Sequence, residues 1–246
     1  MKLWYTFGMD LSPILISMKT ASAGILATFL LGVFAAKCVA DIRRKALKIL
    51  LDGVLTLPLV LPPTVAGFFL LYIFGARRPV GKFLAEYFSF KIAFSWTATV
   101  IAAVVISFPL MYRSARGALE QVDPNLVYAA RTLGMSEWKI FWKVRLPTAL
   151  PGVAAGGVLA FARGLGEFGA TAMLAGNIAG KTRTLPLAIY SAVSAGEAEM
   201  RTASYYAFII VAFSFFIVGL MNFFTLKENF LFFNSFKDKK SLSKKH

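Results

Sequence analysis

Residues 123–147 read DPNLVYAARTLGMSEWKIFWKVRLP and contain the start and stop signals of two short helices. Asp123-Pro124 supplies an N-cap followed by a proline at the first helical position, and Gly134 is the kind of residue that follows the last turn of a helix. Ser136 opens a second helix, which we expect Leu146-Pro147 to end. The apolar residues of the first helix recur at the spacing of one helical face, at Leu126, Ala129, Ala130 and Leu133.

An amphipathic pair of this kind has two uses that the residues alone do not separate. It can lie along a membrane surface as an interfacial anchor, or it can dock into the groove of a partner protein. Trp138 and Trp142, which lie four residues apart in the second helix, suit either use.

Outward from this segment the chain is apolar in both directions. Hydrophobic residues make up 58% of the 246 residues and charged residues 16%, against about 25% charged in soluble domains. Charge-free runs long enough to cross ~30 Å of hydrocarbon as helices lie at 53–76, 92–112 and 202–226. Two further runs carry isolated charges. We therefore expect a single-domain, all-α integral membrane protein with about five transmembrane helices, at 11–36, 50–75, 92–112, 148–174 and 204–226.

The basic residues indicate the orientation. Lys and Arg number 27 against 12 Asp and Glu, and 17 of the 27 lie in the segments 37–48, 113–146 and 227–246. Eight lie in the alternate loops and at the N-terminus. The positive-inside rule places the N-terminus outside and the C-terminus, with its basic tail at about 227–246, in the cytoplasm. The excess of positive charge is then a topology signal beside membrane lipid and not a footprint for nucleic acid.

The same composition excludes several classes of enzyme. The chain has one Cys and one His, so it has no disulfide framework, no Cys-based zinc site and no His-based catalytic triad. We expect no catalytic residue, no metal site and no cofactor bound by this chain.

Prolines and charges inside the apolar runs mark a candidate pathway. Pro62 and Pro63 interrupt the second run, which indicates either a cavity-lining helix or a packing kink, and Pro109 leaves the same choice in the third. Arg163 and Glu167 lie four residues apart in the fourth run, either as a structural ion pair or facing a wet pathway. The candidate pathway or gate residues are Pro62, Pro63, Ser107, Pro109, Arg163, Gly166 and Glu167.

The run Ala129–Gly134, followed by Phe141, Leu146-Pro147 and Pro151-Gly152, resembles the cytoplasmic loop shared by ABC importer permeases. In that family the loop forms coupling helices that dock on a cytoplasmic ATPase subunit. The resemblance implies a type I ABC importer permease fold with a coupling loop at about 123–147. The implied coupling residues are Tyr128, Ala129, Ala130, Arg131, Leu133, Gly134, Met135, Ser136, Trp138 and Phe141. Tyr128 stands where the family has Glu, which puts a specific salt bridge to the ATPase in doubt but not the docking role.

Three further segments, 58–67, 107–111 and 161–170, resemble the molybdate permeases within the sulfate, molybdate and tungstate branch of these importers. The resemblance implies a homodimer that works with an extracytoplasmic molybdate-binding protein and with ATPase subunits that use ATP and Mg²⁺. Sulfate and tungstate remain alternative substrates within the branch.

Two other functions fit the residues less well. A membrane-embedded transferase needs clustered carboxylates for a metal, and the acids of this chain are scattered. An ATP-independent secondary transporter is typically built from inverted repeats, and none is visible.

Overall fold

The computed structural model describes residues 10–42 and 44–219, and its regular elements are helices. Four of them are long and apolar enough to cross a membrane, at Ser12–Ala40, Trp96–Glu120, Glu137–Leu165 and Glu197–Gly219. A bent pair, Lys45–Val60 and Pro63–Phe74, makes a fifth crossing if it is taken as one span. The predicted all-α membrane architecture is therefore confirmed. The end of the last predicted span, at 220–226, and the basic tail at 227–246 lie outside the described residues.

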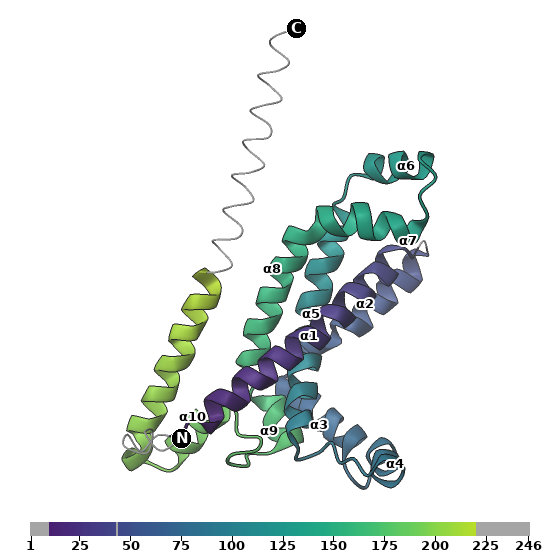
Figure 1. Ribbon diagram of the computed structural model, residues 1–246. Coiled ribbons are helices and arrows are strands. Elements are labelled where there is room, and N and C mark those ends of the chain that lie inside the picture. The colour runs from purple at the N-terminus through teal and green to yellow at the C-terminus, as the bar shows by residue number, and fades with distance from the viewer. Residues whose placement is uncertain (1–9, 43, 220–246) are drawn as a thin grey trace, which may run out of the picture.

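The helices are named in chain order in Figure 1. They are α1 (Ser12–Ala40), α2 (Lys45–Val60), α3 (Pro63–Phe74), α4 (Pro79–Phe88), α5 (Trp96–Glu120), α6 (Pro124–Thr132), α7 (Glu137–Ile140), α8 (Leu146–Leu165), α9 (Gly169–Ala175) and α10 (Leu185–Ser194). A π-helical turn, Phe141–Arg145, joins α7 to α8, and a 3₁₀ turn, Glu197–Glu199, precedes the final helix at 200–219.

The centre of the bundle is the contact between α1 and α5, which run side by side in the same direction. Small residues and hydroxyls four positions apart on α1 face residues at the same spacing on α5, in the pairs Thr20–Thr99, Gly24–Ala103, Thr28–Ser107 and Gly32–Met111. The Thr20 and Thr99 hydroxyl oxygens are 2.9 Å apart, and those of Thr28 and Ser107 are 3.1 Å apart. Small side chains let the two backbones approach closely, and the buried hydroxyls satisfy each other away from water.

Helix α8 packs against both α5 and α1, and it runs opposite in direction to α5. A Cβ atom placed on Gly152 would lie 2.7 Å from the Cβ of Ala118, and Gly156 is as close to Ser114 one turn further along. The GxxxG pair of this run therefore serves a close helix contact within the chain.

The second predicted span is broken rather than continuous. Helices α2 and α3 meet at Leu61-Pro62 with an angle of 109° between them. Pro62 and Pro63 have no N–H group to continue the hydrogen-bond ladder of α2, whereas proline at the first position of α3 costs that helix nothing. The bend that the prolines predicted is present, but the single helix expected at 50–75 was wrong.

The fourth predicted span also differs at both ends. The second helix of the loop does not end at Leu146-Pro147 but continues as one helical segment from Glu137 to Leu165. The π-helical turn absorbs the proline, because the Leu146 N–H bonds to the Phe141 carbonyl and Pro147 begins the next regular turn. The segment then ends at Leu165, and α9 begins only at Gly169, so the span expected at 148–174 is interrupted.

The loops gather at two ends of the bundle (Figure 1). Helices α6 and α7 lie at one end, near the turn between α1 and α2, and this is called the elbow end. Helices α4, α9 and α10 lie at the opposite end, together with the described N-terminal residues.

Candidate coupling and pathway sites

The elbow between α6 and α7 is built from local capping interactions. The Asp123 carboxylate accepts a hydrogen bond of 2.9 Å from the Asn125 N–H at the start of α6. At the other end the Gly134 N–H bonds to the Arg131 carbonyl and the Met135 N–H to the Ala130 carbonyl, at 2.9 and 3.1 Å. This is the pattern of a Schellman motif, and Gly134 has the left-handed backbone, at φ +74°, that the motif requires. The predicted start and end of α6 are confirmed.

An ion pair closes the elbow. The Arg131 Nε donates to Glu137 Oε1 at 2.6 Å, and Arg131 Nη2 donates to Glu137 Oε2 at 3.2 Å. The two-point contact orients α6 relative to α7, and the hydrogen bond from Arg131 to the Glu137 carboxylate raises the pKa of the guanidinium above its ordinary value. The sequence reading missed this pair, because the two residues lie six apart across a glycine turn and not at helical spacing.

The base of the elbow is anchored to the bundle. Phe141 and Ile140 are buried, and Phe141 belongs to the main apolar core with residues of α1, α5 and α8. The Lys37 ammonium lies 4.3 Å from the centre of the Trp138 ring and 4.8 Å from that of Phe141, so the end of α1 is tied to the loop. Arg145 adds an ion pair of 2.6 Å with Asp41 at the same end.

The outer face of the elbow leaves apolar side chains in solvent. Leu133 is 81% exposed, Trp138 61%, Tyr128 59% and Leu126 46%. Most of the predicted coupling residues lie on this surface, at Tyr128, Ala129, Arg131, Leu133, Gly134, Ser136 and Trp138, and Met135 is half-buried. Ala130 and Phe141 are buried, so they support the surface and do not form part of it.

A second site forms where the two helix breaks meet. A Cβ atom on Gly169 would lie 3.1 Å from both Pro63 Cβ and Thr64 N, and one on Gly67 would lie 2.6 Å from Ala170 Cα. The start of α3 and the start of α9 are therefore in backbone contact, although about a hundred residues separate them in the chain. Discontinuous helices that meet inside a membrane bundle are the usual setting for a substrate path. The residues 62–67 and 166–170 are called the break junction.

Glu167 connects the parts of the break junction. One carboxylate oxygen accepts from the Ala170 N–H at 2.8 Å, at the start of α9, and the other pairs with Arg163 Nη1 at 2.7 Å. The Glu167 side chain is almost fully buried, and that of Arg163 is 32% exposed. The predicted pairing of these residues is confirmed, although Glu167 lies beyond the end of α8. Both carboxylate oxygens of Glu167 are therefore bonded within the chain, and the Arg163–Glu167 ion pair stabilises the break junction.

Ser107 and Pro109 are not part of the break junction. Ser107 is buried between α1 and α5, where its hydroxyl donates to the Ala103 carbonyl at 2.7 Å and faces Thr28. Pro109 is buried within the continuous helix α5. Of the candidate pathway residues, the structure brings together Pro62, Pro63, Arg163, Gly166 and Glu167.

A charged network near the elbow end was not foreseen. Arg116 on α5 pairs with Asp52 on α2 and with Glu120, the latter at 2.9 Å, and Lys48 reaches Glu120 at 2.8 Å. The Tyr112 hydroxyl lies 3.1 Å from Asp52. These contacts hold α2, which has no buried residue of its own, against α5. The available signal was Asp52 at the start of the apolar run 53–76, which served only to mark where that run begins.

Residues 28–227 match the family model for the binding-protein-dependent transport system inner membrane component. The chain belongs to this family. The molybdenum transport system permease protein ModB of Haemophilus influenzae is 44% identical over 205 residues, which cover 82% of this chain and 88% of that protein. The ModB of Escherichia coli K12 is 47% identical over 190 residues, covering 77% and 82%. An inward-facing structure of the MetNI methionine ABC transporter superposes with a TM-score of 0.70 at 16% identity, covering 91% of this chain and 98% of that one.

The fold of this transport-system membrane component is that of a type I ABC importer permease, as the resemblance at residues 123–147 implied. The elbow, the break junction and the charged network all lie within the residues that match the family. They are therefore features of the permease core and not of an appended segment.

Proposed function

We propose that this chain is the membrane-spanning permease subunit of an ATP-driven importer of molybdate, and that the elbow couples it to a separate cytoplasmic ATPase. The observation that carries the proposal is the set of exposed apolar side chains at Leu126, Tyr128, Leu133 and Trp138 on an elbow that is anchored to the bundle. Apolar side chains that are exposed to water carry a free-energy cost, and such side chains fit an apolar groove on a partner protein. The identity to molybdenum permeases supports the choice of substrate.

The contacts around the elbow suit the transmission of force. Arg131–Glu137 fixes α6 to α7, Lys37 fixes α7 to α1, and the unbroken segment from Glu137 to Leu165 leads directly to the break junction. A displacement of the elbow by the ATPase is thus delivered along one helix to the place where α3 and α9 meet. In this proposal ATP and Mg²⁺ are bound by the partner, and the permease alternates between two packed states that the partner biases.

The remaining parts of the proposal concern topology and assembly. The distribution of basic residues supports a cytoplasmic elbow end, an outside N-terminus and a cytoplasmic C-terminus. An extracytoplasmic binding protein delivers the oxyanion to the opposite end, and two copies of the chain enclose the path. Selection among oxyanions then resides chiefly in the binding protein, which leaves tungstate and sulfate as the alternatives.

Reconstitution tests this function. The chain is placed in liposomes with the candidate ATPase inside and the candidate binding protein outside, and molybdate uptake and ATP hydrolysis are measured together. We expect uptake only with all components, and hydrolysis that molybdate-loaded binding protein stimulates. Uptake without the ATPase would contradict the proposal. Competition of molybdate uptake by tungstate and sulfate then ranks the substrates, and stronger uptake of sulfate than of molybdate would reassign the substrate while leaving the coupling role intact.

A further inference from the structure

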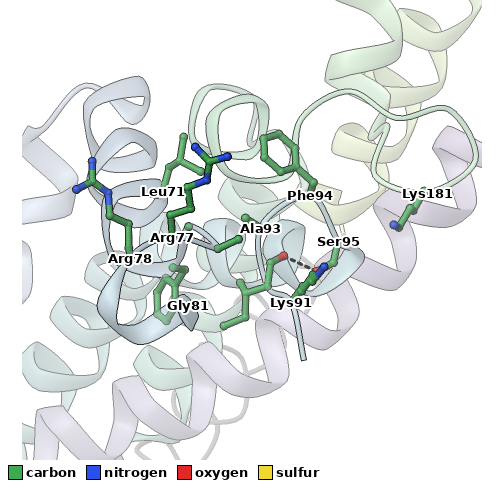
Figure 2. A pocket seen from close by; sticks show the side chains of 13 residues that line it. Leu71, Arg77, Arg78, Gly81, Lys91, Ala93, Phe94, Ser95 and Lys181 are labelled. Atoms are coloured by element: carbon green, nitrogen blue, oxygen red, sulfur yellow. Dashed lines mark hydrogen bonds between the residues drawn. The ribbon is translucent and has the colours of Figure 1, made fainter. Parts of the chain in front are cut away.

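A cationic cavity of about 550 Å³ lies at the end of the bundle opposite the elbow. It is enclosed by the turn between α3 and α4, by the start of α5 and by the loop that follows α9. Four of its lining side chains are basic, at Arg77, Arg78, Lys91 and Lys181 (Figure 2). Among the residues that the structure describes around this cavity there is no carboxylate. This site is called the cationic basin.

The walls of the basin between these charges are apolar. Leu71 and Phe74 come from α3, and Ile92 and Phe94 come from the segment before α5. A small, fully hydrated dianion gains nothing from such walls, since it needs hydrogen-bond donors on several sides. A ligand with one anionic head and an attached apolar part satisfies both the charges and the walls.

The basin is held in shape by contacts of its own. The Arg78 guanidinium lies 4.1 Å from the centre of the Tyr72 ring, which fixes one cation. The backbone of Phe94 is left-handed, at φ +59°, and its N–H bonds to the Leu174 carbonyl at the end of α9. The turn that carries Lys181 is closed by the buried Thr182, whose hydroxyl accepts from the Ile178 N–H at 3.0 Å. The strained backbone of Phe94 and the closed turn that carries Lys181 therefore help to position the basic residues around one cavity.

The neighbouring helix α4 has the character of a membrane-surface helix. Its aromatic side chains Phe83, Tyr87 and Phe88 are all more than half exposed, and they stack on one another with ring centres 4.8 and 6.1 Å apart. Among the described helices α4 packs mainly against α3, so this aromatic surface is left open. Exposed aromatic rings beside basic residues are typical of segments that lie at the boundary between headgroups and acyl chains.

We propose that the cationic basin binds the phosphate headgroup of an anionic phospholipid. The phosphate lies in the basin beside Arg77 and Lys91, the glycerol and first acyl carbons lie against the apolar walls, and α4 rests in the interface beside it. Bound lipid neutralises basic side chains that line one cavity, and it contacts the turn between α3 and α4. The inference does not depend on the transported substrate or on the ATPase.

The test is lipid binding to the purified full-length chain. Palmitoyl-oleoyl-phosphatidylglycerol or palmitoyl-oleoyl-phosphatidylcholine is added to the protein in mixed micelles. Native mass spectrometry then measures the bound lipid, and thermal unfolding measures the change in unfolding temperature. We expect retention of phosphatidylglycerol and a rise in unfolding temperature that phosphatidylcholine does not reproduce. In the double variant Arg77→Gln/Lys91→Gln we expect the affinity for phosphatidylglycerol to fall by roughly tenfold or more.

Lys82→Gln is the matched control, because Lys82 lies on α4 and pairs with Glu86 but does not line the basin. It should bind phosphatidylglycerol as the native chain does. Equal binding of the two lipids, or an equal loss in Lys82→Gln and the double variant, overturns the inference. Displacement of the lipid by millimolar glycerol phosphate or molybdate indicates a site for free oxyanions instead. If the double variant keeps its lipid but loses the candidate binding protein, the basin is a protein-docking surface and the lipid assignment fails.

Discussion

The elbow and the break junction both interrupt a helix, but they do so by different means. The elbow turns at a glycine with a left-handed backbone, and nothing lies within 4 Å of a Cβ atom placed there. The break junction turns at prolines and at the residues 166–168 between α8 and α9. A Cβ atom on Gly67 would collide with α9, and one on Gly169 would be in tight contact with the start of α3. The elbow is a local turn that faces outward, whereas the junction exists only because two distant segments press against each other. Substitutions at the elbow should therefore change coupling, and substitutions at the junction should change stability.

The largest effect is expected at Glu167. Glu167→Ala removes the partner of Arg163 and the acceptor for the Ala170 N–H, so a partly buried guanidinium and a buried backbone N–H are left without their partner. Loss of one member of such a pair costs about 3 kcal/mol. Thermal unfolding in detergent measures it, with Glu137→Ala at the exposed elbow pair as the control that leaves the unfolding temperature nearly unchanged. An equal shift in the two variants would show that the junction is no more sensitive than the elbow.

Gly67→Ala tests the backbone contact between α3 and α9. The added methyl would lie 2.6 Å from Ala170 Cα and 2.9 Å from Met173 Cβ, so the helices must separate. Overpacking of this kind costs about 2 kcal/mol. Gly53→Ala in α2 is the control, because nothing lies within 4 Å of its Cβ position. The expected lowering of the unfolding temperature is confined to Gly67→Ala, and its absence would mean that α3 and α9 are not in contact.

Leu133→Asp tests the elbow as a docking surface. The side chain is 81% exposed, so we expect no loss of stability, but a charge in the middle of an apolar contact should weaken association with the candidate ATPase by roughly tenfold or more. Pull-down and ATPase stimulation in proteoliposomes measure the effect. Gln121→Asp adds the same charge at an exposed position before α6 and should bind normally. Normal association of Leu133→Asp would remove the elbow from the interface.

Gly134→Ala is expected to lower stability less than either junction variant, by about 1 kcal/mol, which is the cost of a left-handed backbone for a residue with a Cβ atom. Gly180→Ala has a similar backbone, at φ +69°, and equally open surroundings at the other end of the bundle. The two variants should unfold at similar temperatures, and only Gly134→Ala should lower molybdate-stimulated ATP hydrolysis. Loss of hydrolysis in both would point to a general effect of strain and not to the elbow.

Local signals in the sequence predicted local structure well. Asp123, Pro124 and Gly134 placed the ends of α6, because a cap is made by atoms within five residues of it. The same reasoning failed at Pro147, since the π-helical turn before it let the helix continue. Proline ends a helix only if the preceding turn cannot rearrange, and the sequence pattern does not show whether it can.

For the candidate site residues, too, local spacing predicted some features and tertiary contacts decided the others. Arg163 and Glu167 were found as a pair because four residues separate them, but the Ala170 N–H bond that makes Glu167 a brace depends on where α9 begins. Ser107 was also a candidate pathway residue, but its partner Thr28 on α1 places it in a packed interface. Burial of Phe141 likewise depends on α1 and α5, which lie far away in the chain.

The apolar runs, the distribution of charge and the helix caps were determined by the residues in order, because hydrophobic periodicity and capping act over one or two helical turns. They were sufficient to predict an all-α membrane protein with a helical loop at 123–147, and the resemblance to ABC importer permeases was needed to identify that loop as a coupling loop. The meeting of α3 with α9, the network of Asp52 with Arg116 and the gathering of four cations in one basin were settled by packing. Each depends on contacts between segments that lie tens of residues or more apart, and such contacts leave no period or spacing in the chain.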